Sequence, residues 1–208
     1  MSSANRQYKI TESISQSSSR QYPTKVYEEY AYVLDILPYG RPTVDRARHV
    51  AVPTVQVIGE NFFTLLEAQL KSGASANIRE RLYVGRERRE KIDRVIGRVG
   101  AEELTAGAQT ELQSVIEDIV RNQEKRFVDF FNNAQAVTPR MHALELLPGI
   151  GKKLMWQIIN EREKKPFSGF ADIKARTGIT DSAKLIARRI VEELSGESKY
   201  RLFTRTTQ

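Results

Sequence analysis

The stretch LELLPGIGKKLMWQIINEREKKPF, residues 144–167, decides the fold expected for the C-terminal part of the chain. Two glycines separate an apolar run from a segment with helical periodicity. Backbone amides at such a helix start attract anions, because they lack intrahelical partners and lie at the positive end of the helix dipole. The candidate phosphate contacts are Gly149, Ile150, Gly151, Lys152 and Lys153. The alternative is that the Pro-Gly pair only connects two packed helices tightly.

A second pair of helical segments follows the first. Apolar residues at helical spacing continue from the glycines to Pro166 and predict one helix, with Trp156 in the core. FADIKART and DSAKLIARRIVEEL predict two more helices around Gly178, the later one capped by Asp181 or Ser182. Thr180 stands where a second glycine is expected, so we expect binding to concentrate in the first hairpin, while the two pairs bury each other's apolar faces.

This arrangement resembles the helix-hairpin-helix family over about residues 140–195. That family is a sequence-nonspecific nucleic-acid module, often used in tandem, whose hairpin glycines and following residues approach the phosphate backbone. The resemblance implies this role for residues 149–153, with Ile150 as the buried anchor. DNA glycosylases also use the motif and need a catalytic aspartate after it. Asp172 is roughly in range, but we interpret it as a carboxylate in the first turn of a helix.

Alternation of period two marks the N-terminal half. VYEEYAYVLDILPYG places Tyr30, Tyr32, Leu34 and Ile36 on one face of a predicted strand and Ala31, Val33, Asp35 and Leu37 on the other. VPTVQVIGENFFTLLEAQL predicts two strands around a turn at residues 59–61, and IRERLYVG predicts another. These short strands with turn signals predict a small β-barrel.

The apolar residues after Arg86 have helical spacing. Ile92, Val95, Ile96 and Val99 fit offsets i, i+3, i+4 and i+7, which predicts a basic helix with Arg86, Arg94 and Arg98 near one face. A solvated helix held by ion pairs is the alternative. Residues 105–134 predict one or two long amphipathic helices with an acidic face and a break near Asn122. Thr138 and Pro139 are expected to start the next helix.

Four segments, in order, carry a wider resemblance. GENFFTLLEAQL, RLYVG, RFVDFFNNA and HALELLPGIGKK resemble domain-of-unknown-function family 655, which is mainly archaeal, over about residues 26–195. The resemblance implies an N-terminal barrel similar to the OB-fold and a C-terminal helix-hairpin-helix domain, without an established activity. We therefore expect an α+β protein with two domains. The expected segments are a disordered tail (1–25), an OB-like β-barrel ending in a basic helix (26–100), an acidic helical connector (101–137), a tandem helix-hairpin-helix domain (138–196) and a frayed tail (197–208).

Composition favours an anionic partner. The chain of 208 residues has 33 basic and 26 acidic side chains, a net charge of +7. The excess lies in residues 78–99, with 8 basic and 4 acidic groups, and in residues 140–208, with 14 and 8. Nucleic acid and acidic membranes both fit such a balance. The absence of cysteine excludes disulfides, thiolate nucleophiles and cysteine metal sites. We expect a soluble cytoplasmic protein without metal, cofactor or membrane span.

An OB-like barrel would add contacts of its own. Aromatic residues could stack bases and arginines could follow the backbone, although aromatics in strands more often fill a core, as expected for Phe62, Phe63 and Tyr32. The candidates here are Tyr39, Arg41, Arg46 and Arg48. The resulting hypothesis is a non-catalytic nucleic-acid-binding protein with a slight preference for RNA over DNA. The alternatives are a glycosylase or nuclease, and a protein scaffold on a ribonucleoprotein.

Overall fold

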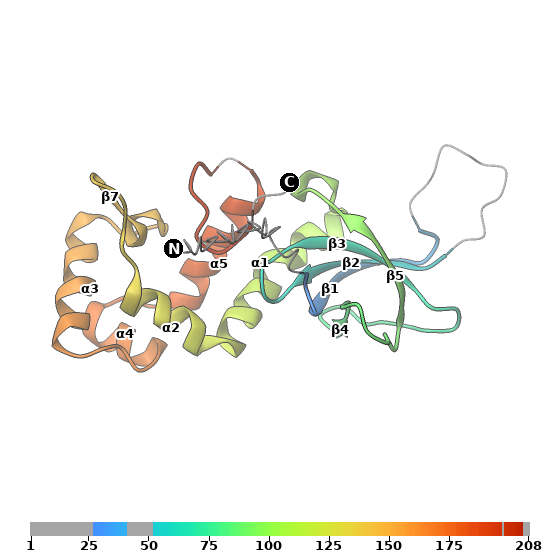
Figure 1. Ribbon diagram of the computed structural model, residues 1–208, viewed down its shortest axis with the longest axis horizontal. Helices are drawn as coiled ribbons and strands as arrows, with labels where there is room; N and C mark the ends of the chain where they lie inside the picture. The colour runs from blue at the N-terminus through green and yellow to red at the C-terminus, as the bar shows by residue number, and fades with distance from the viewer. Residues whose placement is uncertain (1–26, 41–51, 197, 206–208) are drawn as a thin grey trace, which may run out of the picture.

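The computed structural model describes residues 27–40, 52–196 and 198–205. Within these ranges the chain forms a mixed α+β structure, in which a five-stranded antiparallel sheet curls into a half-barrel and five α-helices follow. Figure 1 shows the sheet at one end of the molecule, α3 and α4 at the other, and α1 and α5 between them.

The sheet has the strand order β4-β1-β2-β3-β5, and every pairing is antiparallel. Its strands are β1 (Tyr30–Leu37), β2 (Thr54–Gly59), β3 (Leu65–Leu70), β4 (Arg81–Tyr83) and β5 (Ile92–Arg98). The predicted strands around residues 30–37, 54–70 and 81–83 are confirmed. The alternation predicted for β1 is interrupted, because its register with β2 shifts between Val33 and Asp35. As a result Val33 and Ile36, three residues apart, pack on the same apolar cluster.

The α-helices are α1 (Ala106–Asn122), α2 (Glu124–Asn133), α3 (Lys152–Lys164), α4 (Phe170–Thr177) and α5 (Ser182–Leu194). Short 3-10 helices cover Ala101–Glu103 and Ala143–Leu146. The long helices expected with a break near Asn122 are confirmed as α1 and α2, and the helices on either side of Gly178 as α4 and α5. The side chain of Thr105 caps α1 by accepting a hydrogen bond from the Ala108 amide.

Two apolar clusters hold the structure together. One lies on a single face of the sheet and includes Val33, Val57 and Ile92. The other begins with Leu34 and Ile58 on the opposite face and continues without a break through all five α-helices. Helix α1 packs against both β1 and α5. The segment expected as a connector is therefore a central part of the larger core.

The prediction of a basic helix over residues 86–99 is wrong. Residues 92–98 form strand β5, paired with β3. The register shifts twice along this pair, so β5 carries extra residues that reset its alternation. Ile92 and Val95 consequently meet the same cluster from positions three apart, which imitates helical spacing in the sequence.

The prediction that Thr138 and Pro139 start a helix is also wrong. Residues 136–142 form a small hairpin of β6 (Ala136–Thr138) and β7 (Met141–His142). The 3-10 helix that follows is capped by His142, whose Nδ1 accepts from the Leu144 amide at 3.1 Å. Capping therefore occurs four residues later than the Thr-Pro signal indicates.

The C-terminal segment, expected to be frayed, packs against the helices over residues 198–205. Glu193 on α5 is fully buried, and its carboxylate accepts hydrogen bonds from the amides of Leu202 (2.7 Å), Phe203 (3.1 Å) and Thr204 (3.0 Å). Its remaining charge is paired with Arg189, whose Nε lies at 3.0 Å. The ring of Phe203 packs edge-on against two phenylalanines of α2. A buried carboxylate satisfied by backbone amides thus fixes this segment.

Candidate nucleic-acid interface

The first glycine loop, residues 147–151, leads directly into α3. Gly149 has a φ of +86°, in the left-handed region that favours glycine. The Ile150 amide donates to the carbonyl of Leu147 at 3.0 Å, and the Ile150 side chain is buried, as predicted for the anchor. The loop is therefore held from inside by one apolar side chain, while both of its glycines are exposed.

Gly151 has no structural need to be glycine. Its φ of −86° suits any residue, and a Cβ at this position would meet no atom within 4 Å. It is the N-cap of α3, yet no side chain caps this helix. The first turn of α3 therefore begins without a side-chain cap, at an exposed residue that has no side chain of its own. Such a site lets an anion approach the backbone closely.

The two predicted lysines follow on the first turn of α3. Lys152 and Lys153 are both exposed, and neither forms an ion pair within the part of the chain that the structure describes. Trp156, one turn after Lys152, is 57 % exposed. The prediction of a buried tryptophan is wrong, because the inward face of α3 is filled by Met155 and Ile158. The lysines and the indole share the outer surface of the helix start.

The second glycine loop, residues 177–181, has a similar backbone but different polarity. Gly178 has a φ of +79°, and Ile179 is buried as Ile150 is. Asp181 caps α5 by accepting from the Lys184 amide at 2.9 Å, as expected. Its second carboxylate oxygen binds Arg121 at 2.9 Å. The start of α5 is therefore already occupied by a carboxylate, whereas the start of α3 is open.

One shallow groove joins the two loops. It has a volume of about 410 Å³ and is lined by Pro148, Gly149, Leu154, Gly178, Ile179, Thr180, Asp181, Lys184, Leu185 and Arg188. Lys184 and Arg188 are exposed and add positive charge to the side formed by α5. Sequence analysis missed both residues, although their i, i+4 spacing on the outer face of a predicted helix was a usable signal.

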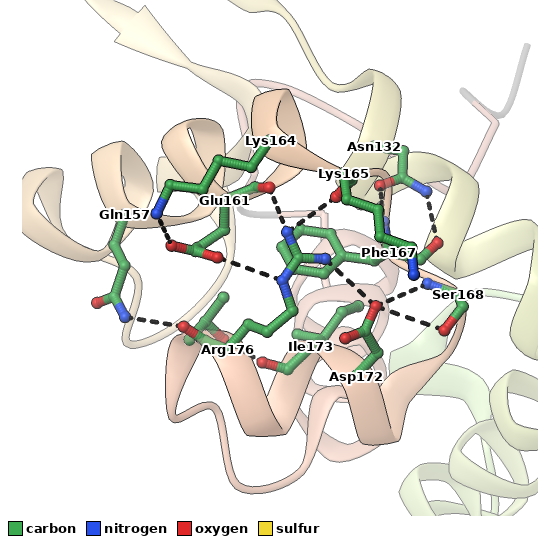
Figure 2. Close-up of polar contacts among 11 residues, drawn as sticks. Asn132, Gln157, Glu161, Lys164, Lys165, Phe167, Ser168, Asp172, Ile173 and Arg176 are labelled. Atoms are coloured by element: carbon green, nitrogen blue, oxygen red, sulfur yellow. Dashed lines mark hydrogen bonds and ion pairs between the residues drawn. The ribbon is translucent and has the colours of Figure 1, made fainter.

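The connection between α3 and α4 is fixed by Arg176, as Figure 2 shows. Its guanidinium lies 4.5 Å from the centre of the Phe167 ring and donates to the Lys165 carbonyl at 2.8 Å. It also pairs with Glu161 at 3.2 Å and Asp172 at 3.3 Å. This network sets the angle at which α4 returns beneath α3, and so positions the second loop beside the first.

Asp172 lies in the first turn of α4, as predicted. Hydrogen bonds from the Ser168 amide and then from Arg176 lower the pKa of its carboxyl group. One carboxylate oxygen accepts from both residues, so its contacts are those of a helix-start carboxylate. The described residues contain no group of three or more His, Asp or Glu side chains arranged to hold a metal ion.

The aromatic residues of the sheet do not form one open surface. Tyr39 is 82 % exposed, as predicted, and Phe63 is buried, as predicted. Tyr30 is covered by the Arg81 guanidinium at 3.5 Å and by Tyr83. Tyr32 and Phe62 are half-buried. The predicted contacts Arg41, Arg46 and Arg48 lie outside the described residues.

The three arginines expected on one helix face are separated. Arg94 donates to the side chain of Gln69 at 3.0 Å. Arg86 and Arg98 instead line one pocket of about 270 Å³, between the loop after β4 and the ends of β3 and β5. Arg86 lies over the ring of Tyr27 at 4.0 Å. The sequence thus identified two residues of a shared basic pocket by way of a wrong secondary structure.

Comparison with known proteins places the chain in a family. The family described as "Protein of unknown function (DUF655)" matches residues 27–205. The uncharacterized protein MJ0038 of Methanocaldococcus jannaschii is 45% identical over 181 residues, which are 86% of this chain and 81% of that protein. The crystal structure of Af1531 from Archaeoglobus fulgidus has a TM-score of 0.79 and 48% identity, covering 86% of this chain and 100% of that one. None of the described helices is long and apolar enough to cross a membrane. The chain belongs to the DUF655 family.

Proposed function

We propose that this protein is a non-catalytic, largely sequence-nonspecific nucleic-acid-binding protein. Its curled sheet would serve as an OB-like module, and α3 to α5 with their two glycine loops as a tandem helix-hairpin-helix module. The first glycine loop would bind phosphate groups of the nucleic-acid backbone. The protein acts by positioning and holding a strand, and no bond is made or broken.

One observation carries the proposal: Gly151 begins an uncapped helix without any conformational or steric need for glycine. A serine or aspartate at this position would cap α3 and stabilise it by about a few tenths of a kcal/mol relative to glycine. The glycine forgoes that stabilisation and leaves amides accessible beside Lys152 and Lys153. A phosphate oxygen satisfies the same amides, and the lysines add the electrostatic contribution that counterion release provides.

The second loop supports different roles for the two sides of the groove, with backbone amides binding on one side and basic side chains on the other. Asp181 already caps α5, so a phosphate gains nothing from that helix start and is repelled by the carboxylate. Lys184 and Arg188 stand one and two turns further along α5 and line the same groove. The proposed strand therefore crosses from the amides of the first loop to the side chains of α5.

The proposal rests on backbone contacts and thus on features common to RNA and DNA. A preference for RNA over DNA requires an aromatic surface on which unpaired bases can stack. Among the described residues, only Tyr39 offers a widely exposed ring on the sheet. Both nucleic acids therefore belong in the test, and a ribonucleoprotein is one setting in which such a protein would act.

The test is a fluorescence-anisotropy titration of the full chain with duplex DNA, duplex RNA and single-stranded RNA over a series of salt concentrations. The variant is Lys152→Ala/Lys153→Ala, and the matched control is Lys125→Ala/Lys174→Ala, which removes the same charge from exposed positions outside the groove. For duplexes we expect the double logarithmic salt slope of the hairpin variant to fall by about 2, and that of the control to stay near the parent value.

Absence of duplex binding by the parent at low salt would refute the proposal. That result would instead favour a scaffold that contacts other proteins. Co-purification of partner proteins after nuclease treatment would test this alternative. Equal losses in both double variants would show that only net charge matters and that the loop has no special role. Sustained release of bases or cleavage of a labelled strand would refute the non-catalytic part.

A further inference from the structure

A second basic site lies far from the glycine loops, at the junction of the sheet and the C-terminal segment. A small cleft of about 70 Å³ is enclosed by the β2–β3 turn, the end of β5, the end of α5 and the segment after it. Arg98, Arg201 and Arg205 line it, and no carboxylate does. The cleft adjoins the larger pocket that holds Arg86 and Tyr27, because Arg98 and Thr64 line both.

The arginines of this junction differ from other arginines of the chain in their ion pairs. Arg79, Arg81, Arg121, Arg176 and Arg189 all form ion pairs. Within the described part of the chain, Arg86, Arg98, Arg201 and Arg205 form none. Among the described residues, Arg201 donates to the Thr204 hydroxyl and the Arg205 carbonyl. Arginines that form no ion pair among the described residues thus gather in a concave site, where the low-dielectric walls strengthen their attraction for an anion.

Both walls of the cleft are held rigid by buried carboxylates. Glu28 accepts hydrogen bonds from the amides of Asn61, Phe62 and Thr64, each at 3.0 Å, and fixes the β2–β3 turn. Glu193 fixes the segment that carries Arg201 and Arg205 in the same manner. Each carboxylate accepts hydrogen bonds from backbone amides. Glu28 also lines the adjoining pocket, whereas arginines are the charged residues that line the cleft itself.

Two guanidinium groups in the cleft and the adjoining pocket stack on aromatic rings. Arg205 lies 3.7 Å above the Phe62 ring, and Arg86 lies 4.0 Å from the Tyr27 ring. A guanidinium stacked on a ring from one side offers its other side to an unpaired base. A cleft of this volume does not admit a double helix, whereas one phosphate group of a flexible strand fits beside the arginines.

We propose that this junction, which we call the arginine cleft (Arg86, Arg98, Arg201 and Arg205), binds a single-stranded extension of the nucleic acid that the glycine loops hold. Arg98, Arg201 and Arg205 contact its phosphates, and the stacked guanidinium groups support its bases. The inference rests on the proposed function for the duplex part of the ligand. The affinity of the cleft for a free single strand is independent of the loops.

The test compares three probes: a blunt RNA or DNA duplex, the same duplex with a ten-nucleotide single-stranded overhang, and a free ten-nucleotide single strand. The cleft variant is Arg98→Gln/Arg201→Gln/Arg205→Gln, with Arg98→Gln alone as a milder variant. Lys125→Gln/Arg140→Gln/Lys174→Gln removes equal charge elsewhere. Unfolding midpoints of all variants are recorded first, and the single variant replaces the triple one if the triple variant is unfolded.

We expect the cleft variant to bind the free strand and the overhang more than about tenfold more weakly at low salt, with a salt slope lower by about 2. Its affinity for the blunt duplex should change no more than that of the charge-matched control. Lys152→Ala/Lys153→Ala should show the reverse pattern. The inference is overturned if the parent does not bind the free strand, or if the cleft variant and control lose equal affinity for it. If the loop variant binds the blunt duplex as tightly as the parent does, while the cleft variant behaves as expected, the proposed function alone is refuted.

Discussion

Gly149 and Gly178, the left-handed glycines of the two loops, line the same groove from opposite sides. Each precedes a buried isoleucine, and each loop leads into a helix at the groove. The two helix starts differ in one respect, because α5 is capped by an aspartate and α3 begins at a bare glycine.

Gly149→Ala should destabilise the protein by about 1 kcal/mol or more. The cause is conformational, because alanine is disfavoured at a φ of +86° and no atom lies close enough to clash with its Cβ. Urea unfolding followed by circular dichroism measures the loss. Gly149→Asn should lose less, because asparagine tolerates the left-handed region. Equal unfolding free energies for the alanine variant and the parent would show that the loop changes its conformation readily.

Trp156 should report binding at the glycine loop directly. It is the only tryptophan of the chain, it is largely exposed, and it lies one turn from Lys152 on α3. We expect its fluorescence to change on addition of duplex nucleic acid, with a midpoint that matches the anisotropy titration. The Lys152→Ala/Lys153→Ala variant should need more ligand for the same change. Binding by anisotropy with an unaltered tryptophan spectrum would place the ligand elsewhere on the surface.

Glu193→Gln should destabilise the protein by about 3 kcal/mol. The carboxylate is fully buried between Arg189 and the amides of residues 202–204. The variant leaves the buried Arg189 with only the longer ion pair to Glu192, at 3.6 Å, and places side-chain N–H groups against backbone N–H donors. Hydrogen exchange should show the amides of residues 202–204 losing protection. Retained protection in a fully folded variant would mean that Phe203 packing alone holds the segment.

The Arg176 network predicts a dependence of stability on pH. Hydrogen bonds from Lys164 and Arg176 lower the pKa of Glu161, and those from Ser168 and Arg176 lower the pKa of Asp172. Both groups have folded pKa values below their unfolded values near about 4, so their stabilisation is complete above that pH and is lost as the pH falls through the folded pKa.

Arg176→Gln should therefore be less stable at neutral pH and should lose less further stability on acidification than the parent does. Urea midpoints at several pH values between about 7 and 2 test this difference. Lys165→Gln is a suitable control, because only its backbone carbonyl takes part in the network. Parallel pH curves for the parent and Arg176→Gln would contradict the predicted coupling.

Local signals made part of this structure predictable. The sequence shows the alternating apolar residues of β1, the two glycines before α3 and the N-cap residue Asp181. The bulges of β5 were not, because an extra residue in a strand gives Ile92 and Val95 the spacing of a helix. The groove and the arginine cleft depend on tertiary packing. No local pattern indicates that Glu193 binds a segment about ten residues later, or that Arg98 and Arg201 line the same cleft.

The most direct test of the central claim is Gly151→Ser, measured for both stability and duplex affinity. Serine suits the backbone conformation of residue 151 and would cap α3, so the unfolding free energy should stay equal or rise by a few tenths of a kcal/mol. The new side chain occupies the approach and competes for the amides, so duplex affinity should fall about tenfold, the effect of one hydrogen bond to a charged group. A variant as stable as the parent that binds duplex with the parent's affinity would contradict the claim that this bare helix start binds phosphate.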